Sequence, residues 1–395
     1  DTADIFLNIF NEKPIFSRKE VIHIMKIICS KSNLLKSVSI SLKAVPSKTT
    51  MPILECILID ATTNQIKFTT NDMELGIETI VEGTIEEKGM VALNAKIFYE
   101  IIRRLPDNDV TIKTDEKFAA TITCEKAKFN IPGKSGEDFA YLPMIERDEP
   151  LTISQYTLKN MIYQTIFSIA VNDNNKLMTG ELFEIKDNCL KIVSLDGHRI
   201  AIRKMPLKKD YSDRKVVVPG KTLNEISKIL SGEMDDVVSI FFTNNHILFE
   251  FDQTMVVSRL IEGEYFRIDQ MLSSDYETKL SINKKEFLDC IDRATLLVRE
   301  GDKKPIIIHI TDGSMELKID SAMGSMNEDI DIEKEGKDIL IGFNPKFLID
   351  ALKVIDDETI DIYLVNPKAP CFIRDEEETY TYLILPVNIN QNQAR

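Results

Sequence analysis

The sequence repeats one pattern three times, in blocks of about 125 residues. Each block opens with a short strand and an amphipathic helix, continues through a strand pair with a tight polar turn, and then returns to a strand followed by a helix. A chain of 395 residues is also too long for one ordinary core. The repeat therefore predicts three domains built on a single plan.

Two helices are predicted in each block from apolar residues at helical spacing. The first helices cover residues 33–45, 155–170 and 284–298, and the second cover 95–105, 221–230 and 345–355. In the first range the apolar face is formed by Leu35, Val38, Leu42 and Val45. Asn283 with Glu286 fits a capping box, and Asn344 before Pro345 is a strong helix start.

Between the helices the chain alternates apolar and polar residues, as in LFEIKDNCLKIVSL and IIIHITDGSMELKID. Turn formers separate these runs, for example Thr63-Asn64, Asp187-Asn188 and Asp312-Gly313-Ser314. Such runs are typical of antiparallel hairpins. The predicted fold class is α+β, with three repeated domains that each carry two helices on antiparallel sheet.

Polar stretches set the expected domain boundaries. The domains are predicted at 25–147, 148–275 and 276–390, with a short tail at 391–395. Residues 1–24 precede the first repeat, and the run from Met25 looks like a native start. We interpret this leader as a non-native addition, an extension from an upstream reading frame or a family-specific arm, and expect it to be less ordered than the rest.

Composition excludes several classes of protein. No run approaches the roughly 20 apolar residues of a membrane helix, and the N-terminal residues lack the basic region of a secretory signal. The 6 cysteines are scattered without a CxxC pair, which favours buried thiols in a reducing cytoplasm. The 4 histidines lack metal-ligand spacing. We therefore expect no metal and no cofactor.

Charge is distributed unevenly along the chain. The net charge is −15, yet the six predicted helices together carry +7, which leaves −22 for the remainder. Lys and Arg are good helix formers, but Glu is equally good and is scarce in these helices. If the helices share one wall, that wall can face phosphate while the sheets remain acidic. Such contacts would be independent of DNA sequence.

The sequence contains none of the motifs GxxxxGK[ST], GxGxxG and GxSxG. Asp196 and His198 lie close together and could be imagined as a catalytic pair. No Ser or Cys nucleophile with its own motif accompanies them, and a turn formed by Asp196 and Gly197 explains the segment better.

Six segments, in order, resemble those of the bacterial sliding clamps, the beta subunits of DNA polymerase III. They are MPILECILI from Met51, LDGHRIAI from Leu195, VVVPGKTLNEISKIL from Val216, SRLIEGEYFRIDQML from Ser258, NPKAP from Asn366 and YLILPVNI from Tyr382. The resemblance extends from Met25 to about residue 390. It implies a non-catalytic processivity subunit of three similar domains, whose two copies close head to tail around double-stranded DNA, with helices lining the hole.

The resemblance also implies a pocket between the second and third domains that binds short peptides of the polymerase catalytic subunit, the clamp loader and repair proteins. Its residues here are Met178, Leu195, Gly197, His198, Arg199, Ile200, Phe266, Gln270, Met271, Lys368, Pro370, Leu383, Ile384, Leu385, Pro386 and Val387. The chain departs from the family's usual residues at Leu195, Phe266, Gln270 and Asn388. These departures leave the peptide preference at the polar rim open.

By the same resemblance, DNA contacts fall on Lys48, Lys96, Arg103, Lys176, Lys221 and Lys228. Apolar contacts between two copies fall on Phe129 in the first domain and on Leu296 and Leu297 in the third. Two alternatives remain. The chain could be a monomeric or trimeric binding protein that uses the peptide pocket alone, or an enzyme that uses Asp196 and His198.

Overall fold

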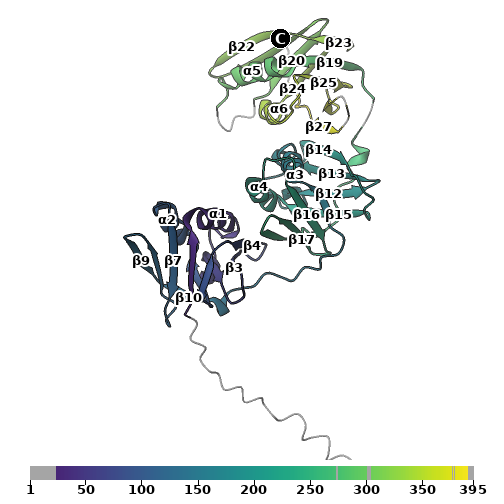
Figure 1. Cartoon of the computed structure of the whole chain (residues 1–395). Helices are drawn as coiled ribbons and strands as arrows, with labels where there is room; N and C mark the ends of the chain where they lie inside the picture. Colours follow the sequence, from purple (N-terminus) through teal and green to yellow (C-terminus); the bar gives the residue numbers. More distant parts are fainter. Residues whose placement is uncertain (1–23, 273–274, 300–303, 376, 378, 390–395) are drawn as a thin grey trace, which may run out of the picture. The chain divides into compact units, whose positions relative to one another are not determined.

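The computed structural model describes residues 24–389 except 273–274, 300–303, 376 and 378. Residues 1–23 of the leader and the tail at 391–395 therefore lie outside the described residues. The described chain forms two compact units (Figure 1). One holds the residues up to Asp72 together with Ile77–Tyr141, and the other holds Met73–Gly76 and the residues from Leu142 onward.

The first unit contains the first repeat except Met73–Gly76. Its helices are α1 (Lys31–Ser41) and α2 (Ala95–Arg104). Its strands are β1 (Lys26–Ser30), β2 (Cys56–Asp60), β3 (Ile66–Asn71), β4 (Leu75–Val81), β5 (Thr84–Glu87), β6 (Met90–Asn94), β7 (Asp109–Thr114), β8 (Ala120–Cys124), β9 (Ala127–Ile131) and β10 (Gly133–Ser135). They form antiparallel arrays in the orders β5-β1-β7-β8-β9 and β10-β6-β2-β3-β4. The core between them includes Leu34 of α1, Phe68 of β3 and Phe98 of α2, all fully buried.

The second unit contains the second and third repeats. Its helices are α3 (Gln155–Tyr163), α4 (Gly220–Ile229), α5 (Lys284–Thr295) and α6 (Pro345–Leu352). Strands of the second repeat are β11 (Leu151–Ser154), β12 (Gly180–Lys186), β13 (Cys189–Leu195), β14 (Arg199–Pro206), β15 (Arg214–Pro219), β16 (Val237–Phe242), β17 (His246–Phe251) and β18 (Thr254–Arg259). Those of the third are β19 (Thr278–Asn283), β20 (Ile306–Thr311), β21 (Ser314–Ser321), β22 (Gly324–Asp331), β23 (Glu333–Gly336), β24 (Ile339–Phe343), β25 (Thr359–Leu364), β26 (Cys371–Arg374) and β27 (Tyr380–Ile384).

One long sheet joins the second and third repeats. Its strand order is β15-β12-β13-β14-β27-β26-β25-β19-β23, so β14 of the second repeat pairs directly with β27 of the third. The antiparallel register places Ile200 opposite Leu383, and Arg199 opposite Ile384. Side chains alternate between the two faces of the sheet along both strands. Successive residue pairs across this junction therefore lie on opposite faces.

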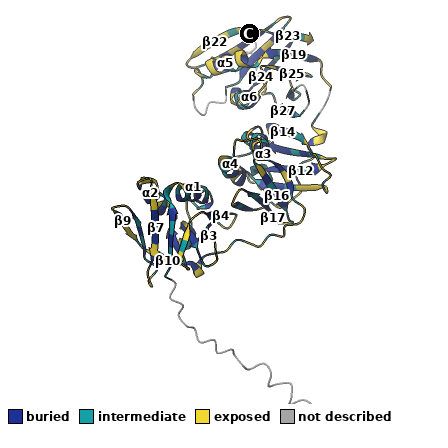
Figure 2. Ribbon diagram, viewed as in Figure 1, coloured by how far each residue is buried: buried dark blue, intermediate teal, exposed yellow. Residues whose placement is uncertain are grey.

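The predicted α+β class and the six helices are confirmed, and the two helices of each repeat pack against one another (Figure 1). Their inner faces are buried and their outer faces exposed (Figure 2). Asn283 and Asn344 cap α5 and α6 by accepting backbone hydrogen bonds from Glu286 and Lys346 at 3.0 Å each. These two predicted helix starts are therefore confirmed.

The predicted helix at 155–170 is wrong in its second half. α3 ends at Tyr163, and the chain continues through a short 3-10 helix, Ile166–Ser168 (η4). The hydroxyl of Thr165 donates to the carbonyl of Met161 at 2.8 Å, and this contact accompanies the irregular turn. The predicted apolar face of the first helix is also shifted, because Leu34 and Val38 are fully buried whereas Leu35 is partly exposed.

Candidate functional site

The two faces of the β14–β27 junction have different environments. Ile200 and Leu383 belong to an apolar cluster on one face. Ala201 and Tyr382, the next residues on each strand in opposite directions, belong to the core of the third repeat on the other face. This alternation places the predicted peptide-site residues of the two strands in two groups, one on each face of the sheet.

The apolar cluster forms the floor of the candidate peptide site. Leu195, Ile200 and Leu383 are nearly buried, and Met178 and Phe266 pack against them while remaining partly exposed. Phe266 meets the Tyr265 ring edge to face at a centroid distance of 5.6 Å. The Tyr265 hydroxyl donates to the carbonyl of Val193 at 3.3 Å, which holds this wall onto β13.

The remaining predicted residues lie at the rim, where most are exposed. Met271 exposes 50% of its surface, Leu385 40% and Val387 39%, which is unusual for such large apolar side chains. Gly197, His198, Gln270 and Lys368 are also exposed, and Pro370 and Pro386 are partly exposed. A buried apolar floor with exposed apolar residues at its edge suits an extended peptide that inserts apolar anchors.

Arg199 and Ile384 lie on the opposite face from this floor. The Arg199 guanidinium donates to Asp196 at 3.0 Å, to Asp350 of α6 at 2.7 Å and to the Phe167 carbonyl at 2.6 Å. It also lies 4.3 Å from the centre of the Phe347 ring. Arg199 is 6% exposed, so it joins the second repeat to the third instead of lining the floor.

Asp196, Gly197 and His198 form the turn that was expected. Gly197 has φ +83°, and Asp196 accepts the backbone hydrogen bond of His198 at 3.1 Å. The other Asp196 oxygen accepts from Arg199, and the His198 ring stacks on Phe347 with centroids 6.1 Å apart. The Asp196 carboxylate therefore accepts hydrogen bonds from the turn backbone and from Arg199. This arrangement does not support a catalytic pair of Asp196 and His198.

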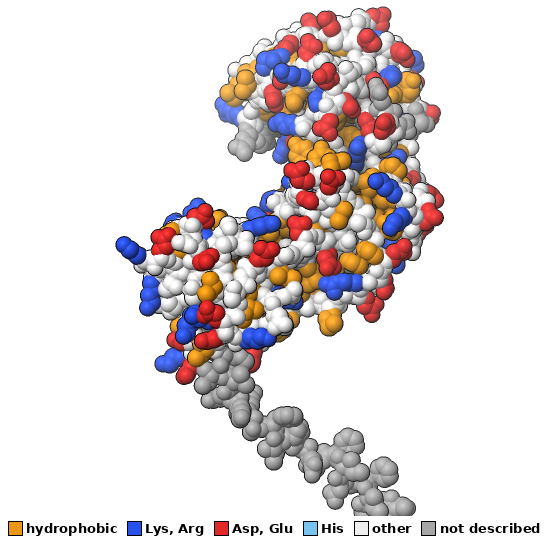
Figure 3. Space-filling view, viewed as in Figure 1, with side chains coloured by type: hydrophobic (Ala, Val, Ile, Leu, Met, Phe, Trp, Pro, Cys, Tyr) orange, Lys and Arg blue, Asp and Glu red, His pale blue; other side chains and the backbone are white. Residues whose placement is uncertain are grey.

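The predicted DNA-contacting cations lie on exposed parts of the molecule. Lys96 and Arg103 belong to α2, and Lys221 and Lys228 belong to α4, while Lys48 lies in the loop after α1. Arg103 pairs with Glu100 at 2.8 Å and Lys228 with Glu225 at 2.7 Å. On the face shown in Figure 3, cationic and anionic side chains are interspersed. Such a surface favours diffuse attraction over one strongly positive patch.

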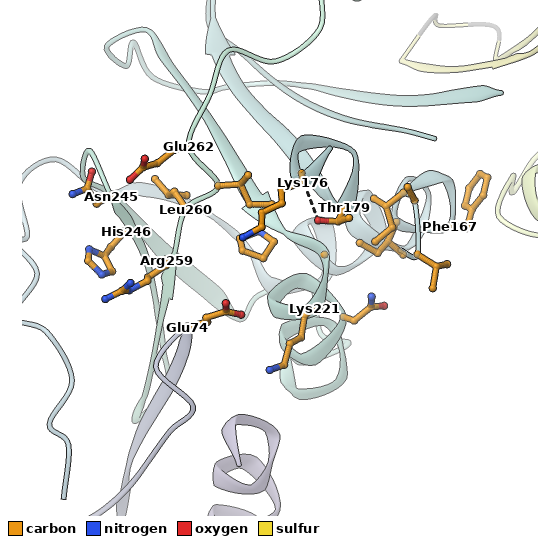
Figure 4. Close-up of a pocket in the computed structure, with 18 residues that line it drawn as sticks. Glu74, Phe167, Lys176, Thr179, Lys221, Asn245, His246, Arg259, Leu260 and Glu262 are labelled. Atoms are coloured by element: carbon orange, nitrogen blue, oxygen red, sulfur yellow. Dashed lines mark hydrogen bonds between the residues drawn. The ribbon is translucent and has the colours of Figure 1, made fainter. Parts of the chain in front are cut away.

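A groove of about 1080 Å³ lies beside two of these cations. Lys176, from the short 3-10 helix Lys176–Thr179, and Lys221 line it together with Arg259 of β18 (Figure 4). In that view Glu74 lies between Lys221 and Arg259. Sequence reasoning missed Arg259 and the lining His246, because charge was counted on the predicted helices alone and both residues lie on strands.

The residues predicted to join two copies lie at sheet edges. Phe129 is 39% exposed on β9, the last strand of its sheet. Leu296, just after α5, is 75% exposed. Leu297 packs against the core of the third repeat and lies beside Gly324, the first residue of the edge strand β22.

Other kinds of site find no support among the described residues. No group of His, Cys, Asp or Glu in the described ranges could hold a metal ion, and no helix there is long and apolar enough to cross a membrane. All 6 cysteines are free, and 5 of them are buried, as the composition predicted. Burial raises the pKa of the Cys29 thiol to about 12, and that of Cys290 likewise, so neither is a reactive thiolate.

Comparison with known proteins identifies the family along almost the whole chain. Residues 25–143 match the N-terminal domain of the DNA polymerase III beta subunit, residues 152–266 its central domain and residues 269–388 its C-terminal domain. The beta sliding clamp of Staphylococcus aureus is 35% identical over 358 residues, which cover 88% of this chain and 95% of that protein.

Solved structures agree. A DNA polymerase III beta subunit structure from Eubacterium rectale is 70% identical, with a TM-score of 0.90, and covers 92% of this chain and 100% of its own. The sliding clamp of Bacillus subtilis is 34% identical, also with a TM-score of 0.90, over 93% of this chain and 100% of its own. The resemblance found in the sequence is thus confirmed, and the chain belongs to the DNA polymerase III beta subunits, the sliding clamps, which are accessory subunits and not enzymes.

Proposed function

We propose that two copies of this chain close head to tail into a ring around duplex DNA in the cytoplasm and hold the replicative polymerase on its template. The proposal is supported by two sheet edges, β9 and β22, each the last strand of its sheet. An edge strand offers unpaired backbone groups to a second chain. The exposed Lys126 and Lys128 near β9 complement the exposed Asp329 and Asp331 on β22, which favours pairing of one edge with the other.

The mass in solution tests ring closure. Light scattering coupled to size exclusion is expected to give twice the chain mass of 45.1 kDa. Phe129→Asp should shift the mass to that of one chain, because it places a charge at an apolar contact opposite an acidic edge. The far-ultraviolet circular dichroism spectrum of the folded chain should remain unchanged. A single-chain mass for the unaltered protein would contradict the dimer and favour a binding protein that uses the peptide site alone.

We further propose that the apolar floor around Leu195, Ile200 and Leu383 takes a short linear peptide from the polymerase, the clamp loader or repair proteins. Peptide anchors would reach the floor between Met178 and Phe266, and the exposed Met271 and Leu385 would cover them. Apolar anchors in such a pocket carry most of the binding energy in interfaces of this kind. Arg199 lies on the opposite face, where it joins the second repeat to the third.

Placing charge at the rim is expected to weaken peptide binding. Met271→Lys with Leu385→Lys should reduce the affinity for a peptide from the polymerase catalytic subunit at least tenfold, a loss of about 1.4 kcal/mol or more. Isothermal calorimetry would measure it. Met234→Lys, at a methionine 64% exposed in a loop after α4, is the matched control and should bind normally. Normal binding by the rim variant would place the peptide elsewhere.

Reversing charge on the helices should weaken DNA retention. Arg103→Glu with Lys228→Glu is expected to shorten the lifetime of the loaded protein on nicked circular DNA and to reduce the salt dependence of binding, because fewer counterions are released. Lys208→Glu with Lys209→Glu makes the same charge change outside the helices and should have a much smaller effect. Equal loss in both variants would indicate an effect of net charge alone.

A further inference from the structure

The solvent face of α3 is aromatic. Tyr156 is 38% exposed and Tyr163 54% exposed. With Asn160 between them they follow the i, i+4, i+7 spacing of a single helix face. The opposite face, with Leu158 and Ile162, is fully buried. The two tyrosines are thus presented outward by the same pattern that buries the helix.

The charge expected on α3 is directed away from this face. Lys159 is the only cationic residue of the helix, and its ammonium group donates to the carbonyl of Leu230 at 3.1 Å. Leu230 is the C-terminal cap of α4, where a cation also favours the helix dipole. Lys159 therefore binds α3 to α4 and is partly covered, so the outer face of α3 carries phenols in place of a cation.

The neighbouring helix supplies the cations that α3 lacks. α3 packs against α4, on which Lys221 and Lys228 are exposed. On α2 a cation and a tyrosine lie together on one helix, since the guanidinium of Arg103 lies 5.9 Å from the ring centre of Tyr99. The exposed residues of α5 and α6 are all charged and include no aromatic side chain.

We propose that Tyr156 and Tyr163 contact the DNA backbone directly and form the uncharged part of the DNA-facing surface in the second repeat. The proposal rests on the proposed ring, in which the helices face the DNA. A tyrosine hydroxyl donates one hydrogen bond, here to a phosphate oxygen, while its ring covers the adjacent sugar. α4, which packs against α3, carries exposed cations, so duplex DNA is the occupant that matches the whole helix pair.

The two contributions differ in their response to salt. A lysine that neutralises a phosphate releases counterions, so its loss flattens the dependence of affinity on salt. A phenol releases none, so its loss should lower affinity equally at every salt concentration. This difference separates the proposed tyrosine contact from a general electrostatic effect.

Titration of the intact protein with a short fluorescein-labelled duplex at several NaCl concentrations tests the proposal. Tyr156→Ala with Tyr163→Ala is expected to weaken binding roughly fivefold with an unchanged salt slope. Tyr156→Phe with Tyr163→Phe keeps the rings and removes the hydroxyls. It should bind more tightly than the alanine variant and less tightly than the unaltered protein, which separates the contribution of the ring from that of the hydroxyl. Tyr141→Ala, at a tyrosine 59% exposed outside the helices, is the control and should bind normally.

The outcomes are distinguishable. If Lys221→Ala and Lys228→Ala flatten the salt slope while the tyrosine variants bind normally, the tyrosine contact is wrong and the ring proposal stands. If the tyrosine variants change the slope as the lysine variants do, they act through general electrostatics and the inference fails. If neither set of variants alters binding, the helices do not face DNA and both proposals fail.

Discussion

Arg199→Met is expected to lower the free energy of unfolding of the second unit by about 3 kcal/mol. The substitution keeps the volume of the side chain but removes its hydrogen bonds to Asp196, Asp350 and the Phe167 carbonyl. The two carboxylates are 15% and 24% exposed, so water compensates them in part and the loss falls at the lower end of the range for buried ion pairs. The lost stabilisation would fall on the junction of the second and third repeats, which Arg199 joins.

Urea unfolding of the full chain, followed by circular dichroism, measures this loss. Arg147→Met is the control, since Arg147 pairs with Glu250 at 3.0 Å but both side chains are about half exposed. An exposed pair contributes less than about 1 kcal/mol. Similar shifts in the two variants would show that burial of Arg199 adds no stability. Peptide affinity measured well below the transition should change little, because Arg199 lies on the opposite face from the floor.

Glu181→Met is expected to raise stability at neutral pH by about 2–4 kcal/mol. Glu181 of β12 is fully buried, and neither carboxylate oxygen has a hydrogen-bond partner among the described residues. Burial raises its pKa to about 8, against a smaller lowering by Thr165, whose hydroxyl already donates to Met161. An ionisable group held neutral in the core stabilises less than an apolar side chain of similar size.

The sign of the pH dependence follows from the raised pKa. Unfolded Glu181 ionises near 4.5, whereas the folded group keeps its proton up to about 8. Between these values folding takes up a proton, so the contribution of Glu181 is fully present below about 4.5 and is lost as the pH rises through about 8. Stability of the native chain should therefore fall across this window and level off above it.

Urea midpoints from pH 5 to 9 would test this prediction. Glu181→Met should remove most of the decline, and Glu181→Gln should flatten the curve without the full gain, because the amide also needs partners. Glu184→Met, on the same strand, removes a carboxylate that pairs with Lys191 and should not raise stability. If stability falls with pH as steeply in the Glu181→Met variant as in the unaltered protein, the pH dependence comes from other groups.

Much of the architecture could be read from periodicity. Helical spacing located all six α-helices that the described residues form, and Asn283 and Asn344 marked two of their starts, because capping depends on residues adjacent in sequence. The early end of α3 could not be predicted, since Thr165 lies in an apolar run that fits a continuous helix. The tertiary packing of η4 against β13 and β14 decides the break.

The candidate site was only partly predictable. Family resemblance selects contiguous runs such as 195–202, whereas a strand sends alternate residues to opposite faces. Applying that alternation to the sequence would already have separated Arg199 from Ile200. The bonds between Arg199 and Asp350 could not have been found, because the two residues are 151 positions apart and no local pattern connects them.

The backbone ladder between β14 and β27 has a mechanical consequence. It runs from Arg199 opposite Ile384 to Arg203 opposite Tyr380, so bending the second repeat against the third would break several hydrogen bonds at once. The shared sheet therefore resists bending between the two repeats. If the apolar floor binds a peptide as proposed, a pull on that peptide acts on both repeats together, because residues of both repeats form the floor.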